Sequence, residues 1–230
     1  DYIWLACRTD PEAKKHKGIS IIIVPTDTPG FSCTPIVTVG QATTTATYYD
    51  DVRVPAANLV GDLHGGWNLI ASQLNHERVG LAAVSALSFR LYDDVVEWAA
   101  TTDAGLGDAS LVIDLPWVQM DLARVHAQLE ALNLMNWRMT VAVEAGELQP
   151  YQASTAKVYG TEGTADVYHT LLGILGAAGH LRGGSPGAVL RGELEAGGRS
   201  AQINTFGGGV NEIQREIIAW MGLGMARGKR

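Results

Sequence analysis

The sequence predicts an α+β protein, with part of a β-domain in residues 1–62 followed by a helical bundle in residues 63–230. Short segments rich in β-branched and aromatic residues, separated by turn residues, fill the first part. After "GDLHGG" the apolar residues recur at helical spacing instead. Glycine and proline then divide the remainder into several long helical segments, and a run of strands before a run of helices is typical of this class.

The strands are predicted from four segments. "YIWLACR" and "ISIIIVP" are short, and the basic stretch "KKHK" between them is expected in a hairpin loop. "TDTPG" forms a turn, after which "FSCTPIVTVG" and "ATYYDDVRVP" are two further predicted strands. Pro55 ends the last of them because proline cannot donate to a strand ladder.

Four helices are expected to make the bundle. The first runs over residues 67–100, the second over 114–145 with Pro116 in its first turn, and the third over 150–175 before the glycines that follow. "LRGELEAGG" holds one helical turn, and "TFGGG" makes a sharp turn into the last helix. Tryptophans on the apolar helix faces are expected in the core: Trp98, Trp117, Trp137 and Trp220.

Composition excludes several classes. A chain of 230 residues that is 47% hydrophobic can bury a substantial core. The net charge of −7 and the lack of a long basic run argue against nucleic-acid binding, and "LLGILGAAG" is too short to cross a bilayer. Two cysteines, no signal peptide and no metal motif favour a metal-free cytoplasmic protein. Because Asp1 opens within a predicted strand, we expect the sequence to be part of a longer polypeptide.

The order and spacing of five motifs carry a family resemblance. They are "DDVRVPAANLVGD", the helix with "LNHER", the helix with "ASTAKVYGTEGT", then "LLGILGAAG", and finally "FGGGVNEIQREIIA". Together they resemble an acyl-CoA dehydrogenase over the whole chain. The resemblance implies that the strands are part of that family's middle β-domain and that the helices are its C-terminal four-helix bundle. Its N-terminal helical domain has no counterpart in this sequence.

The resemblance also implies where the catalytic base lies. Most members carry it as the Glu of a "YEGT" turn before the last helix, and that position is Gly208 in this sequence. A minority carry it on the first long helix of the bundle, in a pattern similar to "LNHER", where the matching residue is Glu77. Glu77 is therefore expected to be the base. Outside the family match, the ordinary interpretation of Glu77 is a helix-surface ion pair with Arg78.

The chemistry implied is removal of an α-proton from an acyl-CoA thioester, with hydride leaving Cβ for FAD. A weakly acidic α-proton needs a carboxylate shielded from water and hydrogen-bond donors at the thioester oxygen. A backbone N–H at Gly208 can still be such a donor, although the glycine run could be an ordinary turn. The resemblance gives substrate-binding positions at Asn75, Arg78 and Gly208, for which packing or ion-pair roles remain open, and cofactor-binding positions at Gly207, Gly209, Val210, Asn211 and Glu212.

Two family motifs that serve a neighbouring subunit's FAD are altered. The loop "WAATTDAGLGDAS" lacks the family's "R-x-x-F-G", and "GILGAAG" replaces "Q-x-L-G-G-x-G". A partner that is a different homologous subunit would supply these parts, so an α2β2 assembly with half as many flavins as chains is expected. It resembles the actinobacterial heterotetramers that act on steroid side chains. A homotetramer is the simpler arrangement of the family.

Two other functions stay open at this point. The chain could be a catalytically silent scaffold subunit that assembles with an active partner, which would also explain the altered cofactor motifs. It could instead be an acyl-CoA oxidase, which passes the electrons to oxygen, whereas a dehydrogenase passes them to electron-transferring flavoprotein. The acyl group itself is not encoded in any recognisable motif.

Overall fold

The computed structural model describes residues 1–83 and 86–226. Residues 84–85 and 227–230 lie outside this description, as do the side chains of residues 75, 76, 78, 79, 81–83 and 86. The chain forms two compact units, Asp1–His76 and Glu77–Arg230. Strands followed by helices confirm the predicted α+β class. The predicted domain boundary after residue 62 stays a prediction.

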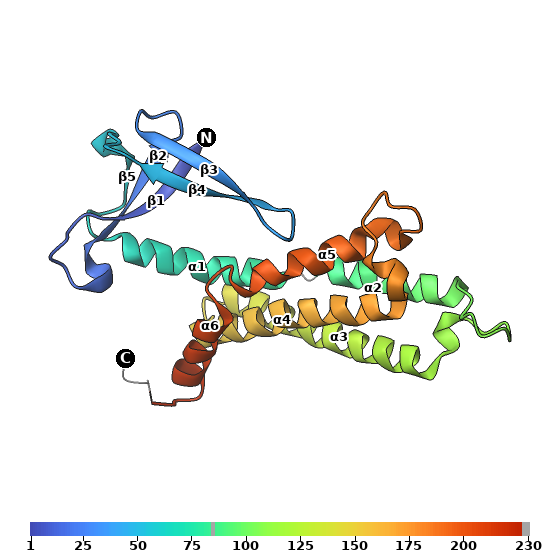
Figure 1. Cartoon of the computed structure of the whole chain (residues 1–230). Helices are drawn as coiled ribbons and strands as arrows, with labels where there is room; N and C mark the ends of the chain where they lie inside the picture. The colour runs from blue at the N-terminus through green and yellow to red at the C-terminus, as the bar shows by residue number, and fades with distance from the viewer. Residues whose placement is uncertain (84–85, 227–230) are drawn as a thin grey trace. The chain divides into compact units, whose positions relative to one another are not determined.

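The first unit is built from two small antiparallel sheets (Figure 1). β1 (Tyr2–Arg8) pairs with β2 (Ile19–Pro25) along its whole length, and the basic loop predicted between them contains a short 3₁₀ turn, Lys15–Gly18. β5 (Leu59–Val60) lies on the other side of β2. β3 (Phe31–Val37) and β4 (Thr43–Tyr49) form the second sheet. The strand predictions are therefore confirmed in number and order up to β4.

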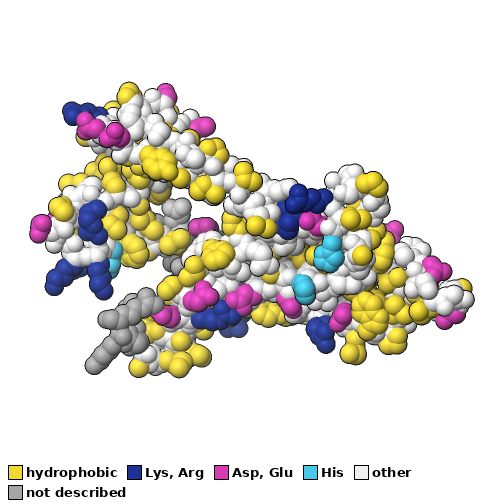
Figure 2. Space-filling view, in the orientation of Figure 1, with side chains coloured by type: hydrophobic (Ala, Val, Ile, Leu, Met, Phe, Trp, Pro, Cys, Tyr) yellow, Lys and Arg dark blue, Asp and Glu magenta, His cyan; other side chains and the backbone are white. Residues whose placement is uncertain are grey.

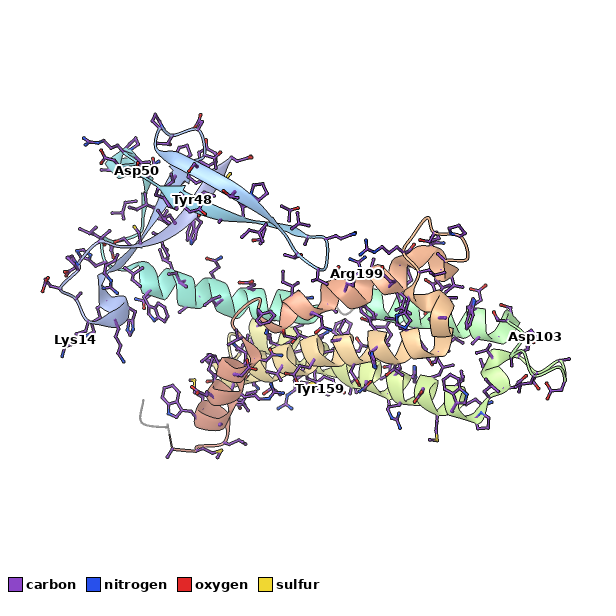
Figure 3. The ribbon with its side chains drawn as sticks, in the orientation of Figure 1. Lys14, Tyr48, Asp50, Asp103, Tyr159 and Arg199 are labelled. Atoms are coloured by element: carbon purple, nitrogen blue, oxygen red, sulfur yellow. The ribbon has the colours of Figure 1, made fainter. Side chains whose placement is uncertain are left out.

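The predicted last strand was too long. β4 ends at Tyr49, whereas the sequence pattern suggested a strand as far as Pro55. Asp50, just beyond Tyr48 and the end of β4 in Figure 3, donates its N–H to Gly30 O at 2.9 Å. Asp51 then adopts a φ of +48°, which an extended strand does not allow. A turn conformation at two aspartates thus ends the strand before its alternating pattern does.

The second unit consists mainly of helices. α3 (Pro116–Glu144) and α4 (Pro150–Leu175) lie close to their predicted bounds, and α2 (Ala86–Thr101) covers the second half of the helix expected over residues 67–100. α1 (Gly66–Ala83) crosses the boundary between the two units, and it covers the first half of the helix expected over residues 67–100. α5 (Glu193–Ala201) is longer than the single turn expected there. α6 (Asn211–Ile217) continues as one π-helical turn, η7 (Ile218–Gly222).

α4 is the central helix of this unit and packs against α2, α3, α5 and α6 (Figure 1). Its apolar side, which includes Leu171, forms one core with fully buried side chains from three of those helices. These are Leu91 and Val95 of α2, Val118, Val125 and Leu129 of α3, and Leu194 of α5. Burial of such residues is the main favourable term in folding. The bundle therefore presents α4 to the segment that precedes α6, where the candidate site lies.

Three of the four tryptophans expected in the core are on the surface. Trp98 packs against the core, but Trp117, Trp137 and Trp220 are 47%, 64% and 47% exposed. Helical spacing alone predicted burial because an apolar helix face looks the same whether it covers a core or meets another chain. Within the described residues, no helix is both long enough and apolar enough to span a membrane.

Candidate active site at the glycine turn

The turn before α6 is formed by three glycines. Gly208 and Gly209 have φ angles of +66° and +97°, which side chains with a Cβ rarely adopt. Gly207 donates its N–H to Ile203 O and Gly209 donates its N–H to Phe206 O, each at 3.1 Å. Gly208 is buried, while Gly207 and Gly209 are half-buried. The glycine run is thus a defined, partly accessible backbone turn.

One side of the turn is held by an amide. Gln214 is fully buried in α6, and its Nε2 donates to Gly208 O at 3.4 Å. Ser154 on α4 donates its Oγ hydrogen to Gln214 Oε1 at 2.8 Å, so the amide is itself fixed in orientation. A Cβ on Gly209 would lie 2.6 Å from Gln214 Nε2. Gly209 is therefore required both for its φ angle and for the space that Gln214 occupies.

The other side is held by a buried lysine. Lys157 on α4 donates from Nζ to Thr205 O at 3.0 Å and to Asn211 Oδ1 at 2.5 Å. Asn211 Nδ2 in turn donates to Thr161 Oγ1 at 3.1 Å and to Glu162 Oε1 at 2.9 Å. Lys157, Thr161 and Asn211 are at most 3% exposed. Buried polar groups that satisfy one another in this way specify a single local structure.

An ion pair closes this network at the surface. Arg215 in α6 donates from Nη1 and Nη2 to the two carboxylate oxygens of Glu162, at 2.7 and 2.6 Å. The hydrogen bonds from Arg215 lower the pKa of Glu162, partial burial opposes this, and Asn211 and the charges of Arg215 and Lys157 lower the pKa further. The two side chains are 42% and 52% exposed, so the pair stabilises the fold only modestly.

Glu162→Gln should lower stability at neutral pH by about 1 kcal/mol or less. Because folding lowers the pKa of Glu162, its stabilising effect is complete above the ordinary glutamate pKa of about 4.3. It is lost as the pH falls through the lowered folded-state value. Thermal unfolding measured between pH 3 and pH 7 should show the difference from wild type shrinking toward acid. Glu130→Gln, at an exposed glutamate on α3, is the control; a difference equal at every pH would contradict the assignment.

Three exposed side chains close to the turn in sequence are apolar. Ile203, Phe206 and Ile213 are 46%, 64% and 37% exposed. A planar, largely apolar ring system could lie against such side chains and approach a backbone that carries no Cβ. Exposed apolar side chains next to a backbone without Cβ atoms are of the kind that line sites for flat ring systems.

The predicted cofactor positions are brought together here, with different environments. Gly207, Gly209 and Val210 are half-buried, with Val210 at the start of α6, and Glu212 is exposed in its first turn. Asn211 differs because both ends of its amide are hydrogen-bonded inside the protein. In this network Asn211 holds the turn, and contact with a cofactor stays a prediction for all five residues.

The predicted base lies on α1. Glu77 is exposed in this chain, at the first residue of the second compact unit. Asn75 and Arg78 belong to the same helix, but their side chains lie outside the described residues. The structure therefore places Gly207–Glu212 in one turn and the start of α6, and it describes Glu77 by its position along α1 and its exposure.

Residue patterns alone did not single out the side chains that hold the turn. Ser154, Lys157 and Thr161 are buried at spacings of three and four residues, so they lie on one face of α4. A polar stripe within an otherwise apolar helix was the available signal. It could not be interpreted because nothing in the sequence showed which segment would lie opposite.

The structure combines short strands, a helical bundle around α4 and a glycine turn held by buried side chains. A comparison with known protein families identifies the class of protein. Residues 64–222 match the family model "Acyl-CoA dehydrogenase, C-terminal domain". The chain belongs to the acyl-CoA dehydrogenase family. It is 50% identical over 238 residues to "Acyl-CoA dehydrogenase FadE26" of Mycobacterium tuberculosis, covering 100% of this chain and 58% of that protein.

Two solved structures show the same fold in close relatives. "Tcur3481-Tcur3483 steroid ACAD" matches with a TM-score of 0.93 and 58% identity, over 99% of this chain and 57% of that one. The "ChsE4-ChsE5 complex from Mycobacterium tuberculosis" matches with a TM-score of 0.91 and 50% identity, over 99% and 58%. The chain thus spans somewhat more than half the length of these relatives.

Proposed function

We propose that this chain is a subunit of an FAD-dependent acyl-CoA dehydrogenase that introduces a 2,3 double bond into an acyl-CoA thioester. Two observations support this proposal: the turn at Gly207–Gly209, which buried side chains hold in place, and membership of the family. A turn held from both sides can present backbone to a ligand in one fixed geometry, which is what stabilisation of a developing charge requires.

The chain's own residues have distinct roles in this proposal. Glu77 accepts the α-proton, since the turn offers Gly208 where a carboxylate would otherwise stand. The backbone N–H of Gly208 donates to the thioester oxygen, where negative charge develops as the proton leaves. Asn75 and Arg78, close to Glu77 in sequence, bind the CoA part of the substrate. Glu77 is exposed in this chain, so bound substrate and neighbouring protein have to shield it from water.

The cofactor proposed for the site is FAD. Gly207, Gly209, Val210, Asn211 and Glu212 lie on the segment that would hold it, and the exposed apolar side chains beside the turn would face its ring. When bound, a flavin supplies the two-electron acceptor that takes the hydride from Cβ. Reoxidation by electron-transferring flavoprotein completes the proposed cycle.

We infer a steroid side-chain thioester as the substrate class. Support comes from the printed description "steroid ACAD" of a relative that is 58% identical. A bulky acyl group also suits Gly80, one turn beyond Glu77, where an added Cβ would meet nothing within 4 Å. The reaction would then belong to β-oxidation of a steroid side chain, with fatty acyl-CoAs as the other candidate substrates.

The test follows flavin absorbance under anaerobic conditions. The purified complex of the full-length chain is mixed with straight-chain and steroid-chain acyl-CoAs, and bleaching identifies the substrates that it oxidises. Steroid-chain thioesters should bleach the flavin fastest; no bleaching by any acyl-CoA would contradict the function. Rapid oxygen uptake in place of transfer to electron-transferring flavoprotein would instead identify an oxidase.

A silent scaffold subunit is the second candidate, and the exposure of Glu77 favours it. In that case the same bundle would serve only to assemble with an active homologue. The two functions differ in which chain supplies the catalytic base. An active subunit uses its own Glu77, whereas a scaffold subunit supplies no catalytic base. Substitution of Glu77 separates them.

The proposed partner is a different homologous subunit in an α2β2 complex. Four apolar side chains of α3 are 63–68% exposed: Met120, Leu134, Trp137 and Val141. Their spacings of 14, 3 and 4 residues place them on one side of the helix. Figure 2 shows apolar side chains gathered over the start of α3 and over the last helix. Surfaces of this kind on a soluble domain usually meet another protein.

A cavity adjoins the same helix and could receive one large side chain of the partner. Its volume is about 170 Å³, close to the roughly 150 Å³ that holds a benzene molecule. Met135, Arg138 and Met139 from α3 and Tyr151 and Gln152 from α4 line it. Methionines adapt to the shape of an inserted group, and Arg138 could pair with an acidic residue beside it. Relatives described as two-component assemblies support this partner.

Trp137→Asp should separate the subunits. Loss of one central, exposed tryptophan from an interface weakens association by about 2 kcal/mol or more. Light scattering on the co-purified proteins would show the complex mass falling to that of the separate components. Leu106→Asp is the matched control, since Leu106 is 62% exposed in the loop between α2 and α3. The wild-type complex should hold one flavin for two chains; one flavin per chain contradicts the heteromeric arrangement.

A further inference from the structure

We propose that Ser154 is a positioning residue for the reaction, because it anchors the buried amide of Gln214 that holds the glycine turn. This role rests on the proposed function, since it is exerted on the backbone assigned to the thioester oxygen. Ser154 acts through Gln214. The Ser154 hydroxyl donates to Gln214 Oε1 at 2.8 Å, and Gln214 Nε2 donates to Gly208 O at 3.4 Å.

The hydrogen bond of Ser154 leads away from its own helix. Two other hydroxyls of α4 bond back to the preceding turn, which is a common arrangement inside a helix. Thr155 Oγ1 donates to Tyr151 O at 2.7 Å. Thr161 Oγ1 donates to Lys157 O at 2.9 Å. Ser154 instead joins α4 to a side chain of α6, 60 residues away in sequence.

The burial of this polar pair needs an explanation. Ser154 and Gln214 are both 0% exposed, and buried polar groups lower stability unless they satisfy each other. Apolar side chains of similar size would fill the same space with no polar atom to satisfy. They could not hold a carbonyl in one direction, because apolar burial is non-directional whereas hydrogen bonds need defined angles. The pair is therefore expected to fix the direction of the Gly208 carbonyl.

The held carbonyl belongs to the peptide group that joins Gly208 and Gly209. Its oxygen accepts from Gln214, and its N–H, which is that of Gly209, donates to Phe206 O at 3.1 Å. The torsions on either side belong to two glycines, with φ angles of +66° and +97°. Because glycine has more conformational freedom than any other residue, such a peptide group rotates easily unless a group outside the turn holds it. Gln214, anchored by Ser154, is a restraint of this kind.

Loss of the anchor should loosen the turn. Without the Ser154 hydroxyl, Gln214 Oε1 becomes a buried acceptor that has lost its described donor. Because an unsatisfied buried acceptor is unfavourable, the amide has to shift toward another donor. Such a shift moves Gln214 Nε2 away from Gly208 O and leaves the glycines free to adopt other conformations.

The proposed reaction is sensitive to this restraint. The N–H assigned to the thioester oxygen is that of Gly208, in the adjoining peptide group. A donor displaced by about 1 Å can lower a rate by roughly a hundredfold. A donor that is already in place also needs no rearrangement as negative charge develops. Restraint of the turn therefore favours the enolate-like form of the substrate over its neutral form.

The test measures ionisation of a bound ligand without turnover. The probe is the 3-oxoacyl-CoA with the acyl chain that bleaches the flavin fastest, because its α-carbon is acidic and its enolate absorbs in the ultraviolet. Titration of this absorbance against pH, in the purified complex of the full-length chain, gives the pKa of the bound probe. Ser154→Ala should raise that pKa by about one unit, a tenfold weaker preference for the enolate. Affinity for the neutral probe at low pH should change by less than about threefold, because the neutral form gains less from a fixed donor.

Ser88→Ala is the matched control. Ser88 is also 0% exposed, and its Oγ donates to another side chain, at 3.2 Å from Tyr168 OH. Tyr168 lies 14 residues beyond Ser154 on α4, roughly 21 Å along the helix axis. This variant removes a buried hydroxyl of the same kind, so it should lower the unfolding temperature. The pKa of the bound probe should stay unchanged, because the glycine turn is not affected.

Further outcomes separate positioning from simple stability. Ser154→Cys keeps the size and a weak donor, should give a smaller shift, and replaces Ser154→Ala if that variant does not fold. An unchanged pKa of the probe in the Ser154 variants overturns the assigned role, and so does an equal shift in Ser88→Ala. A wild-type complex that binds the probe without lowering its pKa overturns the proposed function itself, and the role of Ser154 with it.

Discussion

Glu77→Gln should abolish reduction of the flavin by acyl-CoA while the flavin stays bound. Glutamine has nearly the size and shape of glutamate but cannot accept a proton at neutral pH, so the α-proton has no acceptor. Loss of a positioned general base lowers a rate by about 10²–10⁴-fold. Anaerobic stopped-flow measurement of flavin bleaching, with saturating substrate, gives the rate constant directly. Flavin content determined on the same samples shows that the cofactor site is intact.

Glu97→Gln makes the same chemical change at an exposed glutamate of α2 and should leave the bleaching rate unchanged. Because Glu77 is exposed as well, the two substitutions should have equally small effects on folding. A bleaching rate that survives in Glu77→Gln would identify this chain as a scaffold subunit. The catalytic base would then belong to its partner.

Gly209→Ala should have the second largest effect. An alanine at a φ of +97° is strained, and its Cβ would come within 2.6 Å of Gln214 Nε2. Strain at such a position costs about 1–3 kcal/mol, and displacement of Gln214 also weakens its bond to Gly208 O. We expect the unfolding temperature to fall and the bleaching rate to drop by about a hundredfold, since the whole turn has to move.

Gly163→Ala is the matched glycine control. Gly163 lies inside α4, and a Cβ added there meets nothing within 4 Å. Alanine is favoured over glycine in a helix by about 1 kcal/mol, so this variant should be slightly more stable and fully active. Equal losses of activity in both glycine variants would mean that the turn has no special role.

Much of the fold could be predicted because it depends on local patterns. Pro116 at the start of α3 and the glycines after α4 mark helix ends by their own backbone chemistry, and both positions agree with the structure. The predicted end of β4 was wrong because Asp51 adopts a turn conformation, which the alternation of side chains did not indicate. α5 is longer than the one helical turn expected because the helix continues through Gly197 and Gly198, residues that disfavour a helix interior.

The glycines before the last helix could be predicted as a turn, but the residues that hold this turn could not. Gly207 to Gly209 stand next to "NEIQR", a pattern that resembles a known family. Lys157 and Ser154 lie 48 and 60 residues away in sequence from Thr205 and Gln214, the groups they bind. Only the packing of α4 against α6 and against the 3₁₀ turn Gln202–Thr205 brings them together. Long-range hydrogen bonds of this kind depend on tertiary structure, so the polar stripe on α4 could not show which segment it would bind.

The exposed tryptophans and methionines of α3 and the last helix make the unassembled chain prone to aggregation. A chain released alone would show these side chains to every other hydrophobic surface in the cell, including chaperones and copies of itself. If the proposed α2β2 complex is correct, synthesis of its two kinds of subunit in balanced amounts would cover these side chains as soon as each chain folds. Excess of either subunit would be lost to aggregation or proteolysis, so assembly would also regulate how much of each subunit accumulates.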